Sequence, residues 1–259
     1  MRTPMNRECD SIGEGGVGVM VIEKAASVAD TTADKTKIFY PESDGMPLPD
    51  GLHQYKYFLE ILSVLELFFS TRPDVAVGGD IFIYYVEGNR QMRVAPDCFV
   101  VFGGDIESLE RNDTYLLWEV GKPPDFVLEI GSPSTANNDL TGKRDLYAQL
   151  GMGEYWRYDP TGEDHYGEPL VGERLTDGEY QALEIVHEVD GGVWGYSPAL
   201  NLELHWKEDR LRFHDPAAGR WLQNIEEINA ARESAETRAN AAEARIAEMD
   251  AELRRLRGE

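Results

Sequence analysis

Two charged residues stand at positions where the local pattern calls for apolar side chains. Glu129 lies within the apolar segment 125–130, DFVLEI, which has the length and composition of a central β-strand. A buried, ionised glutamate is strongly destabilising unless it is paired with a cation or binds a metal ion. Glu129 therefore indicates either a structural salt bridge or a cation-binding site at the carboxyl end of its strand, where Gly131, Ser132 and Pro133 follow.

Lys143 lies in a predicted helix over residues 139–150, which ends at Gly151. At about 100° per residue, Lys143 falls near the middle of the apolar arc, whereas Arg144 points away. The arc is formed by Leu140, Leu146, Tyr147 and Leu150. A lysine at this position must either contact an anion or extend its ammonium group to solvent along its stem. Because the helix follows the Glu129 strand through a short loop, it can pack back over the sheet.

Two aspartates are predicted to face each other across a strand pair. Residues 74–102 read as two strands joined at Gly88-Asn89, a typical two-residue hairpin signal. In that register Glu87 faces Arg90 and Asp80 faces Asp97. Opposed like charges destabilise a strand pair unless a cation or a shared proton relieves them. The alternative is a different register or a solvated hairpin end. The predicted constellation is thus Asp80, Asp97, Glu129 and Lys143.

The remaining elements must position these residues. A helix begins near Asp50, its predicted N-cap, with apolar residues at helical spacing: Tyr55, Phe58, Leu59, Leu62 and Leu65. Residues 154–160, EYWRYDP, and several segments between 170 and 206 read as further strands. Residues 1–37 form a predicted loosely attached arm, whose GEGGVG stretch at 13–18 lacks the Lys-Ser/Thr of a phosphate-binding loop.

The C-terminal segment 223–259 carries a different pattern. From Asn224 onward, apolar residues follow alternating three- and four-residue steps: Ile225, Ile228, Ala235, Ala239, Ala242, Ile246, Met249, Leu253 and Leu256. This seam is typical of a coiled coil and is interrupted at Arg232. The alternative is a single solvated helix. We interpret the segment as an oligomerisation or partner-binding element.

Composition limits the classes of function. The chain has 259 residues, 42% of them hydrophobic, and a formal net charge of −23, which is opposite to that of most nucleic-acid-binding proteins. A polyanion would therefore be expected to bind only where metal ions neutralise the site. Cys9 and Cys98 have no metal-type spacing, and neither a signal peptide nor a long apolar run is recognised. We expect a cytoplasmic protein.

Several of these motifs together resemble the Uma-type restriction endonucleases, a branch of the PD-(D/E)XK nuclease superfamily. The segments are YPESDGMPLPDGLHQ, APDCFVVF, PDFVLEIGSPST and DLTGKRDLYAQLGMGEYWRYDP. The resemblance covers 38–222. It implies an α/β fold with a central mixed β-sheet flanked by helices, and hydrolysis of DNA phosphodiester bonds with Mg²⁺ or Mn²⁺.

The resemblance also implies roles for individual residues. Asp97 and Glu129 correspond to the catalytic, metal-binding acids, and Asp80 is a further candidate ligand. Gly131 stands where the motif has its lysine, so Lys143 is the implied catalytic lysine. His53 and Tyr147 are expected to support the site.

Three hypotheses follow from the sequence. The first is a metal-dependent DNA endonuclease, acting as a homodimer through its coiled coil. The second is a catalytically inactive nuclease fold that binds proteins through the coiled coil, which the acidic charge favours. The third is a metal-dependent hydrolase of a small phosphorylated substrate. The retained acid–acid–lysine set favours the first.

Overall fold

The computed structural model describes Tyr40 and residues 52–258, with only the backbone described for Leu52 and His53. The predicted arm at 1–37, its glycine stretch and the predicted cap Asp50 lie outside the described residues. The described chain belongs to one unit, Ile38–Glu259.

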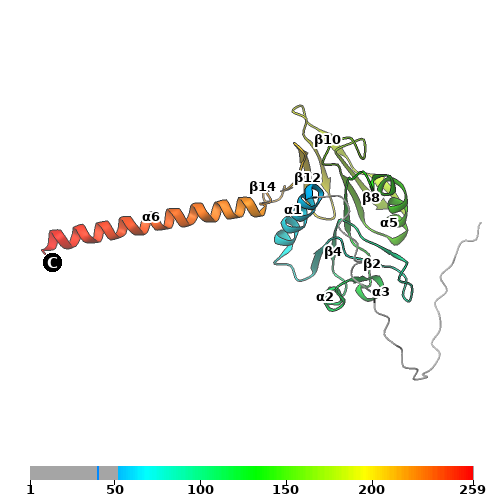
Figure 1. Ribbon diagram of the computed structural model, residues 1–259, viewed down its shortest axis with the longest axis horizontal. Coiled ribbons are helices and arrows are strands. Elements are labelled where there is room, and N and C mark those ends of the chain that lie inside the picture. The colour runs from blue at the N-terminus through cyan, green and yellow to red at the C-terminus, as the bar shows by residue number, and fades with distance from the viewer. Residues whose placement is uncertain (1–39, 41–51, 259) are drawn as a thin grey trace, which may run out of the picture. The chain divides into compact units, whose positions relative to one another are not determined.

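Six strands form a mixed sheet that carries Glu129 near its centre (Figure 1). In sheet order they are β1 (Val75–Gly78), β4 (Cys98–Phe102), β6 (Phe126–Ile130), β7 (Glu154–Tyr158), β8 (Leu170–Thr176) and β9 (Glu179–Ala182). Strands β6 and β7 are parallel, and the other neighbouring pairs are antiparallel. Every residue of β6 and β7 is buried, as predicted for central strands covered on both faces.

A second, antiparallel sheet of five strands contains part of the segment that was predicted only as further strands. Its order is β10 (Ile185–His187), β11 (Val193–Ser197), β12 (Leu202–Lys207), β13 (Arg210–Asp215) and β14 (Arg220–Trp221). Alternate residues of β12 and β13, among them Leu204 and Phe213, share one hydrophobic core with β6, β7 and helix α1 (Leu52–Phe69). The six-stranded sheet therefore has α1 and the second sheet on one face.

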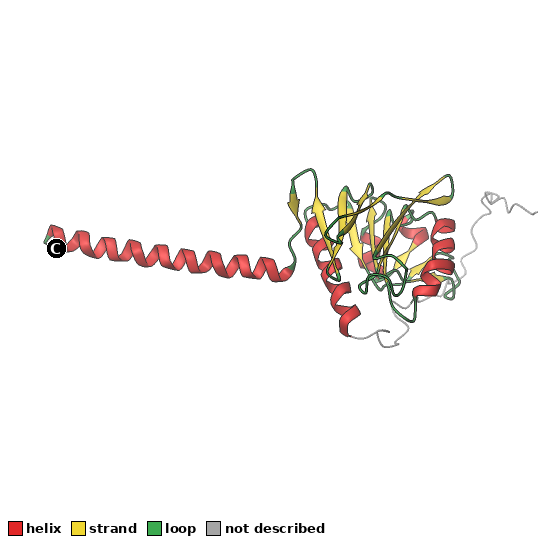
Figure 2. Ribbon diagram, turned by 90° about the horizontal axis from the view of Figure 1, so that it is seen from above, coloured by secondary structure: helices red, strands yellow, loops and turns green. Residues whose placement is uncertain are grey.

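The other face of the six-stranded sheet is covered by a helical segment and by a small third sheet. Phe99, Val127 and Tyr155 pack there against Tyr147 and Met152. The third sheet comprises β2 (Ile83–Tyr84), β3 (Arg93–Val94) and β5 (Tyr115–Leu116), with the short helices α2 (Glu107–Asn112) and α3 (Leu117–Val120) beside it. Figure 2 shows the strands between helices on either side. The predicted α/β fold, with a central mixed sheet flanked by helices, is confirmed.

The predicted hairpin register is confirmed, but the predicted turn is wrong. Ile83 faces Val94 in the small sheet and Val75 faces Phe102 in the large one, and both pairs keep the register expected from Gly88-Asn89. The loop is longer than two residues, because Tyr85 and Met92 close it through a backbone hydrogen bond of 3.2 Å. Each predicted strand is also broken into two.

Helix α1 forms where predicted, and its buried face matches the predicted one in part, because Leu65 is buried and Phe58 and Leu62 pack against the core. Tyr55 and Leu59 are 41% and 45% exposed, whereas Ile61, Val64 and Leu65 are buried. The helix is apolar around most of its circumference, so its sequence is compatible with more than one inward face.

The segment predicted as a helix over 139–150 is helical from residue 136 and contains a π-helical turn. Helix α4 (Ala136–Asn138), the π-helix η1 (Asp139–Lys143) and helix α5 (Arg144–Leu150) follow one another without a break. Gly151 ends the segment with φ of 82°, as predicted from its position. Leu140, placed on the inward arc by the regular helical period, is instead exposed.

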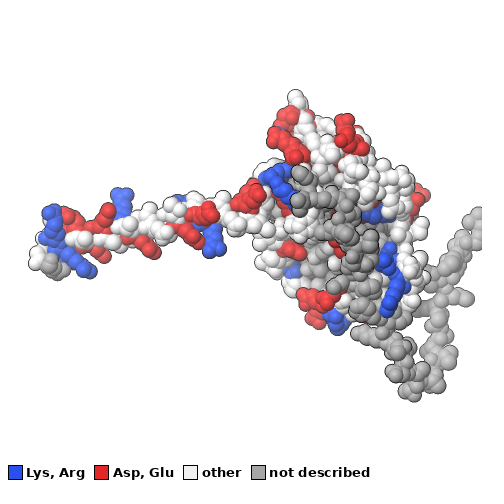
Figure 3. Space-filling view, viewed as in Figure 1, with Lys and Arg blue, Asp and Glu red and all other residues white. Residues whose placement is uncertain are grey.

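Helix α6 (Ile225–Arg257) matches the predicted C-terminal helix and begins with a capping box between Asn224 and Glu227. Every residue from Asn229 to Gly258 is exposed. Figure 3 shows acidic side chains spread along α6 and a basic group in its last turn. No helix within the described part of the chain has the length and apolarity needed to cross a membrane.

Candidate nuclease-type active site

The site lies at the carboxyl end of β6, where β4 begins on the neighbouring antiparallel strand. Cys98 pairs with Leu128 in the ladder, so the preceding residue, Asp97, comes opposite Glu129. The Ile130 amide donates a hydrogen bond of 2.7 Å to Oδ2 of Asp97 and fixes that carboxylate against the strand end. Gln54 of α1 donates to the Ile130 carbonyl at 3.3 Å, so the start of α1 also borders this edge.

Glu129 is 1% exposed and is held at both carboxylate oxygens. The Lys143 ammonium donates to Oε2 at 2.8 Å, and the Tyr147 hydroxyl donates to Oε1 at 2.5 Å. The predicted approach of Lys143 to the Glu129 strand is therefore confirmed, and Tyr147, expected to support the site, contacts the same carboxylate.

Asp139 is a third buried carboxylate that the sequence reading missed. Its Oδ1 lies 3.0 Å from the Lys143 ammonium, and its Oδ2 accepts a hydrogen bond of 2.8 Å from the Tyr166 hydroxyl. The contact with Lys143 is a charge contact without hydrogen-bond alignment, and Oδ1 accepts no hydrogen bond from the described residues. The signal that could have found Asp139 is its position four residues before Lys143, on the same side of a helix.

The pKa values show an excess of negative charge. Burial raises the pKa of Asp97 to about 6, against the opposing effect of Lys143. Burial raises the pKa of Glu129 further, to about 8, with added repulsion from Asp97 and Asp139. Glu129 therefore retains a proton near neutral pH even though Lys143 lies beside it.

Lys143 itself remains cationic. Burial alone would lower its pKa, but the surrounding carboxylates, Glu129 first, outweigh that effect and raise it above the ordinary value of 10.5. An ammonium group with a raised pKa does not give up its proton at neutral pH, so Lys143 can act as a fixed positive charge and hydrogen-bond donor.

A separate ion-pair group flanks the site on β7 and β8. Arg157 lies beside Glu129 in the parallel ladder, and its Nη1 is 2.8 Å from Oε2 of Glu173. Arg144 also binds Glu173, at 2.7 Å, and is about one-third exposed. Arg144, predicted to point away from the apolar arc, is paired with a buried carboxylate at the edge of the sheet.

Asp80 does not join the buried carboxylates. It is exposed, has φ of 52°, and its amide donates to the Pro96 carbonyl at 3.0 Å. The preceding residue, Gly79, passes so close to the Asp97 carbonyl that an added Cβ would lie 2.2 Å from it. The two strands thus meet where predicted, but Asp80 lies beyond the last ladder pair, Gly78 with Phe99, and has a left-handed backbone. The side chain of His53 lies outside the description.

The donor set is compatible with a hard divalent cation. Asp97 and Glu129 offer carboxylate oxygens on opposed strands. The proton that Glu129 retains near neutral pH could be replaced by a bound cation. Asp80, Asp97 and Glu129 do not all bring oxygens within 4.8 Å of one another. Mg²⁺ needs only one or two protein carboxylates, with water and phosphate oxygens completing its coordination. Asp97 and Glu129 are sufficient for that requirement.

Comparisons with known proteins found a family model and a solved structure that are similar to this chain. The chain resembles the crystal structure titled as "a putative nuclease belonging to DUF820" from Anabaena variabilis, with 18% identity and a TM-score of 0.43 over 60% of this chain and 76% of that one. A search of curated proteins found no match. The family model Uma2, described as "Putative restriction endonuclease", matches residues 42–206, which span the opposed acids of β4 and β6 and the lysine that follows them. The chain therefore belongs to the Uma2 family.

Proposed function

We propose that this protein is a divalent-metal-dependent endonuclease that hydrolyses DNA phosphodiester bonds. The observation that carries the proposal is the buried contact between Lys143 and Glu129 at 2.8 Å, opposite Asp97. A buried lysine and several buried acids are expensive to maintain in a fold, and a site that had lost its function would be expected to lose them.

Asp97 and Glu129 are the residues that would hold the cation, Mg²⁺ or Mn²⁺. Such a cation lowers the pKa of a bound water and neutralises charge on a phosphate. The Ile130 amide and the Tyr147 hydroxyl keep the two carboxylates in place, since each binds one carboxylate oxygen. This positioning limits the rotation of both acids before substrate binds.

Lys143 would stabilise the additional negative charge that develops on the phosphate during hydrolysis. Its raised pKa suits a permanent cation rather than a general base. Asp139 lies 3.0 Å from the ammonium group and would hold Lys143 in orientation when Glu129 is engaged elsewhere. Asp139 is therefore a positioning residue in this proposal.

The acidic surface restricts how DNA approaches. The chain carries 25 basic and 48 acidic side chains, and the face shown in Figure 3 has separate groups of basic and of acidic side chains among uncharged ones. Long-range attraction to DNA is therefore weak, and binding would depend on positive charge at the site itself. We expect cleavage to need millimolar rather than trace concentrations of Mg²⁺.

Pairing of two chains through α6 is part of the proposal. Ile246, Met249, Leu253 and Leu256 are 46–71% exposed on this helix and continue the predicted seam. Two sites held in one dimer could cut both strands of a duplex. The same exposed seam also favours the second candidate function, an inactive nuclease fold that binds proteins through α6.

The test is cleavage of supercoiled, linear and single-stranded DNA by the purified chain across Mg²⁺ and Mn²⁺ concentrations. We expect metal-dependent nicking by the wild type, loss with Glu129→Gln, and retention with Lys122→Met. Lys122 is a matched control because it also binds a carboxylate, that of Asp125 at 2.7 Å, at the opposite end of β6. Equal cleavage by wild type and Glu129→Gln, or none by the wild type on any substrate, would favour the inactive module.

A further inference from the structure

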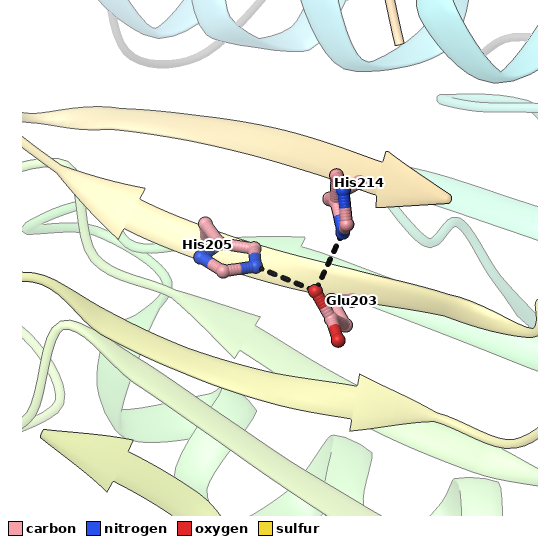
Figure 4. Close-up of side chains that lie close together, drawn as sticks. All are labelled: Glu203, His205 and His214. Carbon is pink, nitrogen blue, oxygen red and sulfur yellow. Dashed lines mark hydrogen bonds and ion pairs between the residues drawn. The ribbon is translucent and has the colours of Figure 1, made fainter. Parts of the chain in front are cut away.

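A second polar cluster lies on the five-stranded sheet, away from the carboxylates of β4 and β6. Glu203 and His205 are two residues apart on β12 and so share a face, and His214 of β13 stands directly opposite Glu203 in the ladder. Nε2 of His205 and Nδ1 of His214 lie 3.1 Å and 2.7 Å from the same atom, Oε2 of Glu203 (Figure 4). Two imidazoles therefore converge on one carboxylate oxygen.

The spacing of these donors suits a metal ion. One ligand atom from each residue lies within 4.8 Å of the others, and no other group of His, Cys, Asp and Glu in the described chain is as close. Ligands of a tetrahedral ion with bonds of about 2.0–2.2 Å lie about 3.4 Å apart. The contacts of 2.7 and 3.1 Å would therefore need to open by about 0.7 and 0.3 Å to admit an ion.

Aromatic residues hold both imidazoles in place. Trp194 stacks on His205 with an interplanar angle of 17°, and Trp221 packs 4.7 Å from the ring centre of His205 and 5.0 Å from that of His214. The cluster residues remain 18–23% exposed at their side chains, so an ion can reach them. Rings that are oriented before an ion arrives lose little freedom on binding it.

The charges nearby are also compatible with a cation. Partial burial alone would raise the pKa of Glu203, but the hydrogen bonds from the two imidazoles outweigh it and lower the pKa, so the ligand carboxylate is anionic. Arg212 faces His205 across the ladder, and its positive charge would repel a bound cation. Its guanidinium is neutralised by Glu227 of α6 at 3.0 Å.

We propose that Glu203, His205 and His214 bind one divalent transition-metal ion of the zinc class. Imidazole nitrogens together with a carboxylate select such ions, whereas Mg²⁺ prefers oxygen ligands alone. Three protein ligands leave a coordination position open. His205 also lines a hollow of about 650 Å³, together with Trp221 and Lys207, so water or an anion can approach the cluster from that side.

This site is independent of the proposed nuclease chemistry. The ion would join β12 to β13, the strands that pack against α1 and lead to α6. Binding to the folded state alone would raise the melting temperature.

The experiment is titration of the metal-stripped full chain with Co²⁺, followed by its visible absorption, and displacement by Zn²⁺. We expect one equivalent of Co²⁺ to give the intense bands of a tetrahedral ion. Glu129→Gln should keep this binding, which separates it from the carboxylate site. His187→Ala should also keep it, because His187 is an exposed histidine on β10 of the same sheet and outside the cluster.

Glu203→Gln and His214→Ala should abolish the tetrahedral signal and the Zn²⁺-induced rise in melting temperature. Glu203→Gln keeps the size of the side chain and a hydrogen-bond acceptor. It therefore tests whether the cluster binds the ion even if His214→Ala does not fold. Absence of stoichiometric binding by the wild type, or unchanged binding by Glu203→Gln, would overturn the proposal.

Discussion

Replacing Glu129 by glutamine tests whether the site holds an excess of negative charge. The folded protein keeps a proton on Glu129 up to a pKa of about 8, whereas an unfolded chain releases it near the ordinary value of 4.5. Between these values the folded state binds more protons, so the free energy of unfolding falls as the pH rises. The stabilisation is complete below the unfolded pKa and is lost once the pH passes the folded pKa. Glutamine cannot titrate, so Glu129→Gln removes this dependence.

The magnitude follows from the size of the shift. A full difference of one proton changes the free energy of unfolding by about 1.4 kcal/mol per pH unit. Integrated from about pH 5 to pH 7, the contribution of Glu129 falls by about 2.5 kcal/mol. Groups distant from Glu129 affect wild type and variant alike, whereas Asp97 and Asp139 interact with it, so the difference between the two proteins reports the coupled carboxylates together, with Glu129 as the largest contributor.

The assay is urea unfolding of both proteins in a chelating buffer across this pH range. Excess Mg²⁺ should stabilise the wild type more at pH 8 than at pH 5, because it replaces the proton, and should stabilise Glu129→Gln little at either pH. Glu173→Gln provides a control of opposite sign. Burial alone would raise the pKa of Glu173, but Arg144 and Arg157 outweigh it and lower the pKa, so its contribution is lost as pH falls. A wild-type minus Glu129→Gln difference that does not change with pH would refute the charge assignment.

Three further predictions concern the lysine, the metal and the C-terminal helix. Lys143→Met should lower the free energy of unfolding by about 3–5 kcal/mol, because it leaves buried carboxylates without their cation. It should also slow DNA cleavage by about 100-fold or more in a gel assay. Lys143→Arg should restore stability better than cleavage, and full cleavage by Lys143→Met would contradict the assigned role. Calorimetric titration with Mg²⁺ should show binding to the wild type and none to Asp97→Ala or Glu129→Ala. If both variants release the same heat as the wild type, these acids do not bind the metal and have a structural role. Light scattering should give a dimer for the full chain and a monomer for a chain ending at Gln223, whereas equal monomer masses would exclude pairing through α6.

The features that could be predicted from the sequence depend on short-range patterns. The apolar run around Glu129 identifies a central strand because both its faces are covered. Gly151 ends its helix because a left-handed residue is needed there. The hairpin register was predicted correctly although the turn was not. The alternation of side chains on 75–78 and 99–102 fixes which residues face the core, and this does not depend on the turn.

The features that could not be predicted depend on contacts distant in sequence. The four-residue spacing could place Asp139 beside Lys143, but its hydrogen bond from Tyr166, 27 residues later, could not be predicted. Asp80 has the right register, but its left-handed backbone follows from the close approach of Gly79 to Asp97. The cluster of Glu203 with His214 depends on the pairing of β12 with β13, which local sequence does not specify.

The π-helical turn at Asp139–Lys143 affects how relatives of this chain should be aligned. In an uninterrupted α-helix, residues eight apart are offset by about 80° around the axis. A π turn takes more residues per revolution and reduces that offset, which brings Asp139, Lys143 and Tyr147 into one row while Leu140 lies exposed on the outside. A relative with one residue fewer in this turn would keep the helix and both acids of the sheet, yet would rotate Asp139 out of the row. A single-residue gap here therefore marks a change in the site rather than ordinary variation in a loop.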